Sequence, residues 1–182
     1  MAPSRARTRE RAGALWVFAY GSVMWHSGFA YLERRPALVY GYHRAFCVYS
    51  WLYRGTPEKP GLVLGLAPGG ACRGLAFRVA EQQAAATLDY LDQRENIYRV
   101  YRRRLVPVRA GRERIEAHAY IADPRGPQYA GNLSDEEIVA LLREGRGERG
   151  SGLEYLENTV RHLEELGIPD RRLHRLLARA RR

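Results

Sequence analysis

The chain has 182 residues, of which 46% are hydrophobic, so we expect one domain with a packed core. No apolar run approaches the ~20 residues of a transmembrane helix, which argues against a protein that crosses a membrane with helices. The formal net charge of +10 raises the hypothesis of an acidic or nucleic-acid partner, which the motifs must support or exclude.

The first segment, residues 1–13, contains four arginines and lacks the apolar stretch of a secretory signal. Chain termini without apolar anchors are commonly loose. We therefore expect a basic, disordered N-terminal tail over residues 1–13 and a single domain over residues 14–182.

Runs of apolar, aromatic and β-branched residues predict four strands in the first half, over residues 15–20, 37–50, 62–66 and 73–79. The first run stops at Gly21, and the second contains Gly41 as a candidate bulge. Residues 54–61 hold two prolines and two glycines, which favours a loop. Pro68-Gly69-Gly70 is expected to end the third strand.

The alanines and leucines of residues 81–95 favour a helix, and two further strands are expected over residues 100–108 and 114–121. The last third is helical: Ser134 begins a capping box with Glu137, and amphipathic segments follow over residues 153–166 and after Pro169-Asp170. This order indicates an α+β fold. We expect a small mixed β-barrel with helices packed outside it and a helical C-terminal third.

The residue types give no signal for a bound metal or a nucleic acid. Cys47 and Cys72 form no CxxC, and the five histidines show no metal-binding spacing such as HExxH. Only Lys59 among the 30 basic residues is a lysine, and the arginines are spread along the chain. We interpret the charge as a solvated basic surface that attracts acidic small molecules, and we expect buried thiols in a reducing cytoplasm.

Glu95 is a charged residue at a position where the pattern of its predicted helix calls for an apolar one. Ala84, Leu88 and Leu91 form the stripe of the predicted helix that faces the core, and Glu95 takes the next position on it. Burial and the negative end of the helix dipole both disfavour a charged carboxylate, so both raise its pKa. A carboxylate of this kind suits general acid–base catalysis near neutral pH.

Two simpler roles for Glu95 remain open at this point. The helix could end one residue earlier and leave Glu95 in a loop. Glu95 could also form an ordinary ion pair with one of three nearby arginines, Arg94, Arg99 or Arg102, although Arg94 is expected to point away from the stripe.

Two further positions are candidate ligand contacts. Gly21, after the first strand, allows main-chain N–H groups to converge on a ligand oxygen, although an ordinary turn would look the same. Ser22 follows it, but no GxSxG motif supports a nucleophilic serine. Tyr155 lies at a helix start after a glycine-rich break, where a phenol can point into a cleft or simply be half buried.

Five segments, in order, resemble the ChaC-type γ-glutamyl cyclotransferases of the glutathione-specific branch. They are residues 16–22 (WVFAYGS), 54–61 (RGTPEKPG, followed by LVLGL), 72–78 (CRGLAFR), 90–95 (YLDQRE) and 154–156 (EYL). The resemblance covers roughly residues 15–168.

This resemblance implies the cyclotransferase barrel over residues 14–182 and no cofactor or metal. It implies that the substrate is a small molecule, glutathione, which is converted to 5-oxoproline and cysteinylglycine. It places the catalytic glutamate on Glu95 and a substrate-site tyrosine on Tyr155. The loop that binds the γ-glutamyl group falls on Val17, Phe18, Ala19, Tyr20, Gly21 and Ser22.

Two segments depart from the family pattern. Residues 150–153 read GSGL where relatives often have Gly-Arg-Asn, and residues 50–53 read SWLY where relatives often have Ser-Thr-Asp-His. A cyclotransferase for other γ-glutamyl peptides or amines therefore remains an alternative, as does a regulatory or binding protein of the same fold.

Overall fold

The computed structural model describes residues 14–95 and 99–182, so the predicted tail over residues 1–13 lies outside the described residues. The strands are β1 (Leu15–Ala19), β2 (Glu33–Ser50), β3 (Gly61–Val79), β4 (Tyr101–Ala110), β5 (Glu113–Ala122), β6 (Arg146–Gly147) and β7 (Gly150–Ser151). The helices are η2 (Ser22–Met24), η3 (Glu81–Gln83), α1 (Ala84–Glu95), α2 (Asp135–Glu144), α3 (Gly152–Glu165) and α4 (Arg171–Ala180).

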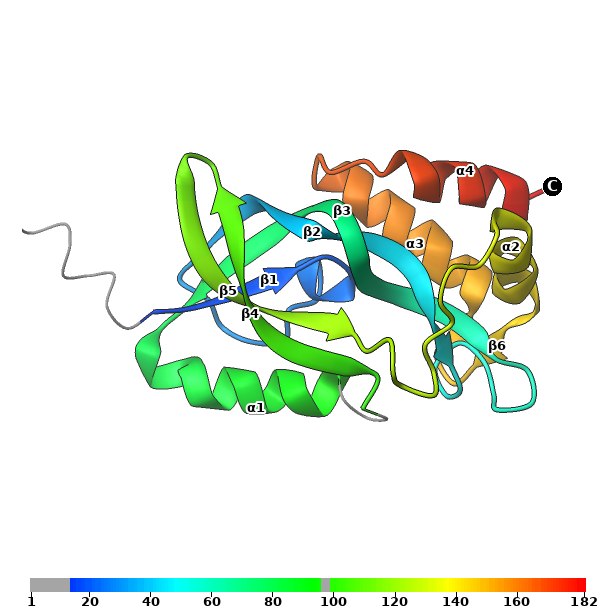
Figure 1. Cartoon of the computed structure of the whole chain (residues 1–182), viewed down its shortest axis with the longest axis horizontal. Coiled ribbons are helices and arrows are strands. Elements are labelled where there is room, and N and C mark those ends of the chain that lie inside the picture. Colours follow the sequence, from blue (N-terminus) through cyan, green and yellow to red (C-terminus); the bar gives the residue numbers. More distant parts are fainter. Residues whose placement is uncertain (1–13, 96–98) are drawn as a thin grey trace, which may run out of the picture.

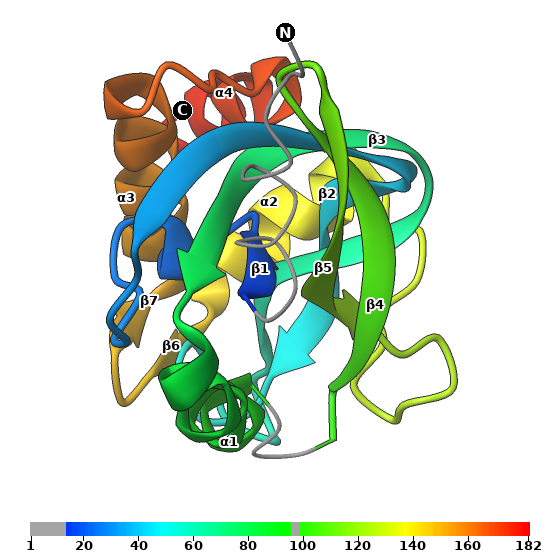
Figure 2. The same ribbon diagram turned by 90° about the vertical axis from the view of Figure 1, so that its left-hand side faces the viewer.

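Five strands close into a barrel in the order β1-β3-β2-β4-β5. Neighbouring strands pair antiparallel, except that β1 meets β5 in a short parallel contact at Val17 and His118. In Figure 2 the long strands β2 and β3 arch over β1, while β4 and β5 stand at one side. The prediction of a small mixed barrel is therefore confirmed, and closure leaves β1 paired on both sides.

The long β2–β3 ribbon corrects the prediction that a strand ends at Pro68-Gly69-Gly70. β3 continues through these residues as one strand, paired with β2 along its length. The pairing shifts register between Tyr40 and Tyr42, where Gly41 has a φ of 83°. Gly69 and Gly70, at φ values of 97° and 71°, lie opposite this shift. Glycines that adopt positive φ on both strands bend the ribbon without ending it.

Helices α2, α3 and α4 pack together against β3, on the side of the barrel away from α1 (Figure 1). The side chains of Ser134 and Ser151 cap α2 and α3 in two capping boxes, and Asp170 caps α4. Leucines fill the space beneath them, including the fully buried Leu142 and Leu156. Each buried leucine contributes roughly 1.5–3 kcal/mol, so this cluster holds the C-terminal third on the barrel.

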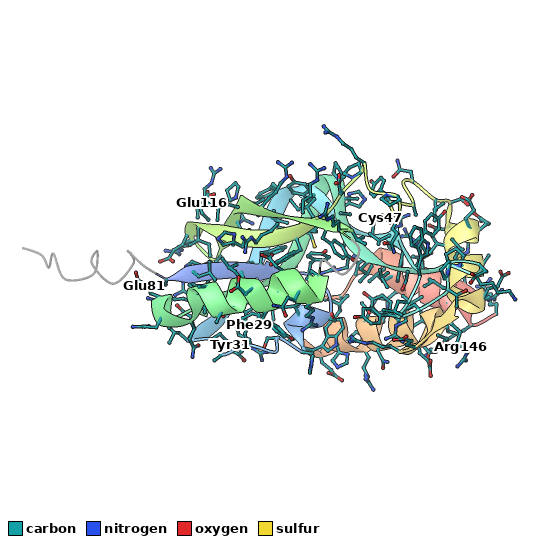
Figure 3. All side chains as sticks on the ribbon, turned by 90° about the horizontal axis from the view of Figure 1, so that it is seen from below. Phe29, Tyr31, Cys47, Glu81, Glu116 and Arg146 are labelled. Atoms are coloured by element: carbon teal, nitrogen blue, oxygen red, sulfur yellow. The ribbon has the colours of Figure 1, made fainter. Side chains whose placement is uncertain are left out.

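Helix α1 and the C-terminal helices occupy different ends of the molecule. Glu81, just before α1, and Arg146, just after α2, lie toward opposite ends (Figure 3). Both cysteines are buried and unpaired, as expected. The longest described helix, α3, has 14 residues, and none of the helices in residues 14–95 and 99–182 has the length and apolarity of a membrane span.

Candidate active site

A cavity of about 220 Å³ opens where the end of β1, the end of α1, the start of α3 and the loop after β2 meet. All eight predicted site residues line it: Val17, Phe18, Ala19, Tyr20, Gly21, Ser22, Glu95 and Tyr155. They come from three segments that are far apart in the sequence. Within residues 14–95 and 99–182, no group of three His, Cys, Asp or Glu side chains is arranged to hold a metal.

Glu95 is the last residue of α1, and its side chain is only 19% exposed. Burial raises its pKa, which is the direction expected from the sequence, and Arg94 opposes this rise. The stripe that presents Glu95 differs in part from the prediction. Leu91 is fully buried, but Leu88 is only partly so, and Thr87 is the other buried residue of α1.

Arg94 corrects a second expectation, because its side chain points toward the cavity. Its Nε lies 3.4 Å from Oε1 of Glu95, so Glu95 does form an ion pair, and Arg94 is its partner. The same guanidinium donates to Oγ of Ser22 at 3.0 Å and to the carbonyl oxygens of His26 and Ser27 at 2.6 and 3.2 Å. Arg94 therefore fastens the end of α1 to the turn that follows β1.

That turn presents unpaired donors to the cavity. Gly21 has a φ of −134°, and a Cβ built on it would meet no atom within 4 Å. The backbone N–H groups of Gly21, Ser22 and Val23 donate to no acceptor in the described part of the chain. The first N–H groups of a helical turn have no partner within it, so these groups are available to a ligand oxygen.

Arg44 binds the backbone at the start of this turn, and no feature of the sequence had identified it as a site residue. Its buried guanidinium donates to the carbonyl oxygens of Tyr20 and Arg73, each at 2.6 Å, and to Oδ2 of Asp170 at 3.0 Å. Asp170 is the N-cap of α4. This buried ion pair thus connects the C-terminal helices to the backbone of the candidate site. No local pattern could have revealed it, because its partners are 24 to 126 residues away.

Three phenols interact electrostatically with Glu95: that of Tyr20, which is buried, and those of Tyr101 and Tyr155, which are half-buried. Burial raises the pKa of Tyr155 to about 12, with a smaller rise from Glu95. Burial and nearby charges, including Glu95, also raise the pKa of Tyr20 and of Tyr101 well above the usual value. All three are therefore neutral at physiological pH. Tyr20 donates to the carbonyl oxygen of Tyr120 at 2.8 Å, and Tyr101 to that of Leu64 at 2.7 Å.

Tyr155 occupies the first turn of α3, as its position after the glycine-rich break predicted. Its hydroxyl accepts a long hydrogen bond, 3.5 Å, from the backbone N–H of Leu64. The guanidinium carbon of Arg54 lies 5.1 Å from the centre of its ring. The sequence did not mark Tyr101 or Arg54 as cavity residues, although Arg54 begins the RGTPEKPG segment that carried part of the resemblance.

The chain matches the family described as ChaC-like protein over residues 15–182. It is 33% identical over 170 residues to the glutathione-specific γ-glutamylcyclotransferase of Escherichia coli, covering 93% of this chain and 74% of that protein. It is 30% identical over 188 residues to the Schizosaccharomyces pombe protein of the same name, covering 92% of each chain.

A crystal structure of a yeast γ-glutamyl cyclotransferase specific to glutathione has the same fold. It superposes with a TM-score of 0.84 over 93% of this chain and 96% of that one, at 21% sequence identity. The five-stranded barrel with its C-terminal helices is therefore shared with a solved cyclotransferase. With a family match that runs through the whole described domain, these findings show that the chain belongs to the ChaC-like protein family.

Proposed function

We propose that this protein is a γ-glutamylcyclotransferase that cleaves glutathione to 5-oxoproline and cysteinylglycine, with Glu95 as its general acid and base. The observation that carries the proposal is the meeting of Glu95 with the Tyr20-Gly21-Ser22 turn and Tyr155 in one cavity. The relatives named above are glutathione-specific γ-glutamylcyclotransferases at 30% and 33% identity, which supports glutathione as the substrate.

The reaction is an internal aminolysis that needs no water. The α-amine of the γ-glutamyl group attacks the side-chain carbonyl carbon, a new C–N bond closes the five-membered ring, and the amide C–N bond breaks. The amine must lose a proton, and the departing amine of cysteinylglycine must gain one. One carboxylate can accept the first proton and donate the second, which contributes roughly 10²–10⁴-fold to the rate.

The surroundings of Glu95 suit this exchange. A raised pKa brings the carboxylate closer to the point at which its two forms are equally populated near neutral pH, and both forms are needed in one turnover. Arg94 holds the carboxylate in place and limits the rise, because a cation stabilises the charged form. The phenols of Tyr20, Tyr101 and Tyr155 stay neutral because their pKa values are raised, so they do not take the amine proton in place of Glu95.

The turn after β1 is assigned to the γ-glutamyl group. The N–H groups of Gly21, Ser22 and Val23 have no partner within residues 14–95 and 99–182, so they can donate to the α-carboxylate or to the oxygen that becomes negative during ring closure. A donor aimed at such an oxygen is worth about 3–4 kcal/mol in comparable sites. The open space above Gly21 lets the substrate approach this backbone closely.

The proposal is tested by incubating the purified chain with glutathione and quantifying both products by liquid chromatography. Equimolar 5-oxoproline and cysteinylglycine are expected. The α-linked isomer of glutathione is the matched substrate control, because ring closure in it cannot release the dipeptide. γ-Glutamyl-alanine tests the alternative substrate class. Turnover of γ-glutamyl-alanine with inert glutathione would overturn the glutathione assignment, and no 5-oxoproline from either compound would overturn the activity.

We further propose that residues 14–182 form the catalytic domain and that the enzyme acts in the cytoplasm. The family match over residues 15–182 supports the first statement. The two free, buried thiols of Cys47 and Cys72 support the second, because exported domains commonly pair their cysteines. Fractionation of the source cells with an antibody to the chain tests the location.

A further inference from the structure

The charges that line the cavity are unequal in number. Among its described lining residues, three are cationic, Arg54, Arg94 and Arg149, and one is anionic, Glu95. Arg94 pairs with Glu95. The other two arginines come from the segments around β6 and β7 and after β2, so the cavity has an acid–base side and a cationic side.

Tyr155 lies between these two sides. Its phenol interacts electrostatically with Glu95, and its ring lies 5.1 Å from the guanidinium carbon of Arg54. Arg54 in turn interacts with Arg149, and the two cations repel each other. Interactions therefore connect Glu95 to Tyr155, Tyr155 to Arg54, and Arg54 to Arg149.

The two arginines of the cationic side are not equivalent. Arg54 is committed to the protein, because its guanidinium donates to the carbonyl oxygens of Arg149 and Ser151 and also interacts with the charge of Glu154. It positions the β6–β7 hairpin. Arg149 is exposed, and no carboxylate within residues 14–95 and 99–182 forms an ion pair with it.

Arg149 is nevertheless held in place. Its guanidinium carbon lies 4.0 Å from the ring centre of Tyr53, and its backbone N–H donates to the carbonyl oxygen of Tyr53 at 3.0 Å. Stacking on an aromatic face leaves the edge of a guanidinium, with its N–H donors, free for a carboxylate. The two residues of this pair lie in or beside the two segments, residues 50–53 and 150–153, that depart from the family pattern.

We infer that Arg149, stacked on Tyr53, binds the carboxylate at the far end of the substrate from the γ-glutamyl group, which in glutathione is the glycine carboxylate. This inference rests on the proposed function and adds the direction in which the substrate lies in the cavity. The γ-glutamyl group lies at Glu95 and the Gly21 turn, and the departing peptide lies against the cationic side. The favoured substrates are γ-glutamyl peptides with a terminal carboxylate rather than γ-glutamyl amines.

The test compares glutathione with glutathione glycinamide, in which a neutral amide replaces the glycine carboxylate. The wild-type chain is expected to favour glutathione in kcat/KM, mostly through KM. Arg149→Ala is expected to lower kcat/KM for glutathione about 3- to 10-fold, the range for a charge-assisted contact at an exposed site, and to lower the value for the amide less, so that the preference for glutathione shrinks. Arg149→Lys should fall between, because it keeps the charge but loses the planar contact.

Arg146→Ala is the matched control. Arg146, labelled in Figure 3, is an exposed arginine of the same hairpin and carries the same charge. It is not among the residues that line the cavity. The ratio of kcat/KM for glutathione to kcat/KM for the glycinamide should be the same in Arg146→Ala as in the wild type. An unchanged ratio in Arg149→Ala, or the same fall in Arg146→Ala, would overturn the assignment of Arg149.

Calorimetric binding of the same two compounds separates this inference from the proposed reaction. Tighter binding of glutathione than of the glycinamide, lost in Arg149→Ala, is expected whether or not the chain turns them over. If that difference appears without any 5-oxoproline, the proposed reaction fails and the binding assignment stands. If the wild type releases 5-oxoproline but binds both compounds equally, the assignment of Arg149 fails and the reaction stands.

Discussion

Helices α1 and α3 each bring one candidate residue to the same cavity, Glu95 and Tyr155, but they are held in place by different forces. α3 begins with a capping box at Ser151 and buries an apolar stripe that includes Leu156 and Leu163. α1 follows a short 3₁₀ turn that has no side-chain cap, and only Thr87 and Leu91 are buried along its 12 residues.

Polar contacts at its C-terminal end position α1 instead. Arg94 bonds to the turn after β1, and Asp92 accepts from the hydroxyl of Tyr120 at 2.6 Å and pairs with Arg103 at 3.0 Å. A typical hydrogen bond contributes about 0.5–1.5 kcal/mol, less than a buried leucine. Hydrogen bonds and ion pairs thus position α1, which carries Glu95. Burial of apolar side chains positions α3, which carries Tyr155.

The largest effect is expected from Glu95→Gln. It removes the proposed proton carrier but keeps the size of the side chain, so kcat should fall roughly 10²–10⁴-fold. 5-Oxoproline release and the melting temperature are measured together. Glu116→Gln is the control, because Glu116 is an exposed β5 residue outside the cavity lining. Wild-type activity in Glu95→Gln would remove Glu95 from the mechanism.

The next largest effect is expected in the free energy of unfolding, which should respond differently to leucine substitutions in α3 and in α1. Leu156→Ala deletes a fully buried side chain of α3 and should lower the free energy of unfolding by about 2–5 kcal/mol. Leu88→Ala on α1 removes a partly exposed side chain and should cost much less. Urea unfolding followed by circular dichroism gives both values. Equal losses would contradict the view that α1 is positioned mainly by polar contacts.

Arg94→Met tests those polar contacts and the pKa of Glu95 together. Loss of the hydrogen bonds from a charged donor should lower kcat/KM about 10-fold at neutral pH. The cation lowers the pKa of Glu95, so its removal should raise that pKa and move the acid limb of the pH–rate profile upward. Arg161→Met, an exposed α3 residue outside the cavity lining, is the control. A limb that stays in place would show that Arg94 does not act on Glu95.

The smallest effect is expected at the cap of α3. Ser151→Ala removes the side-chain acceptor for the N–H of Glu154 and should cost about 1 kcal/mol of stability. Ser134→Ala makes the same change in α2, away from the cavity, and should cost a similar amount. Chemical denaturation measures both. A loss of about 3 kcal/mol or more at Ser151 alone, well beyond an ordinary cap, would show that this serine has a role beyond the helix.

The local elements of this fold could largely be predicted from the sequence. The capping box at Ser134 and the stripe that ends at Glu95 depend on residues three or four positions apart, and the helices formed where these patterns placed them. The capping box at Ser151 was not anticipated. β3 was predicted as two strands, because Pro68-Gly69-Gly70 usually ends a strand and only the facing Gly41 shows that it bends instead.

Only two signals in the sequence predicted residues of the candidate site: the family resemblance and the core-facing stripe of the helix that ends at Glu95. The turn after β1, Glu95 and Tyr155 were all selected and do line one cavity. The Arg44–Asp170 pair, the phenol of Tyr101 and the inward direction of Arg94 were not, because each depends on contacts formed only when the barrel closes. Periodicity indicates which face of a helix a residue occupies, but not which distant atom its side chain meets.

The pH dependence of kcat/KM for glutathione shows whether a buried Glu95 carries the proton. Burial raises the pKa of Glu95, so activity that needs the ionised carboxylate should fall as pH drops through a pKa above the ~4.3 of an unperturbed glutamate. The same raised pKa means that the folded state binds the proton more tightly than the unfolded state. Stability should therefore decrease as pH rises from the unfolded pKa to the folded one.

Both signals should disappear in Glu95→Gln, whose residual activity should lack this acid limb. An acid limb at the ordinary glutamate pKa, or one that persists unchanged in Glu95→Gln, would contradict proton transfer by a buried Glu95.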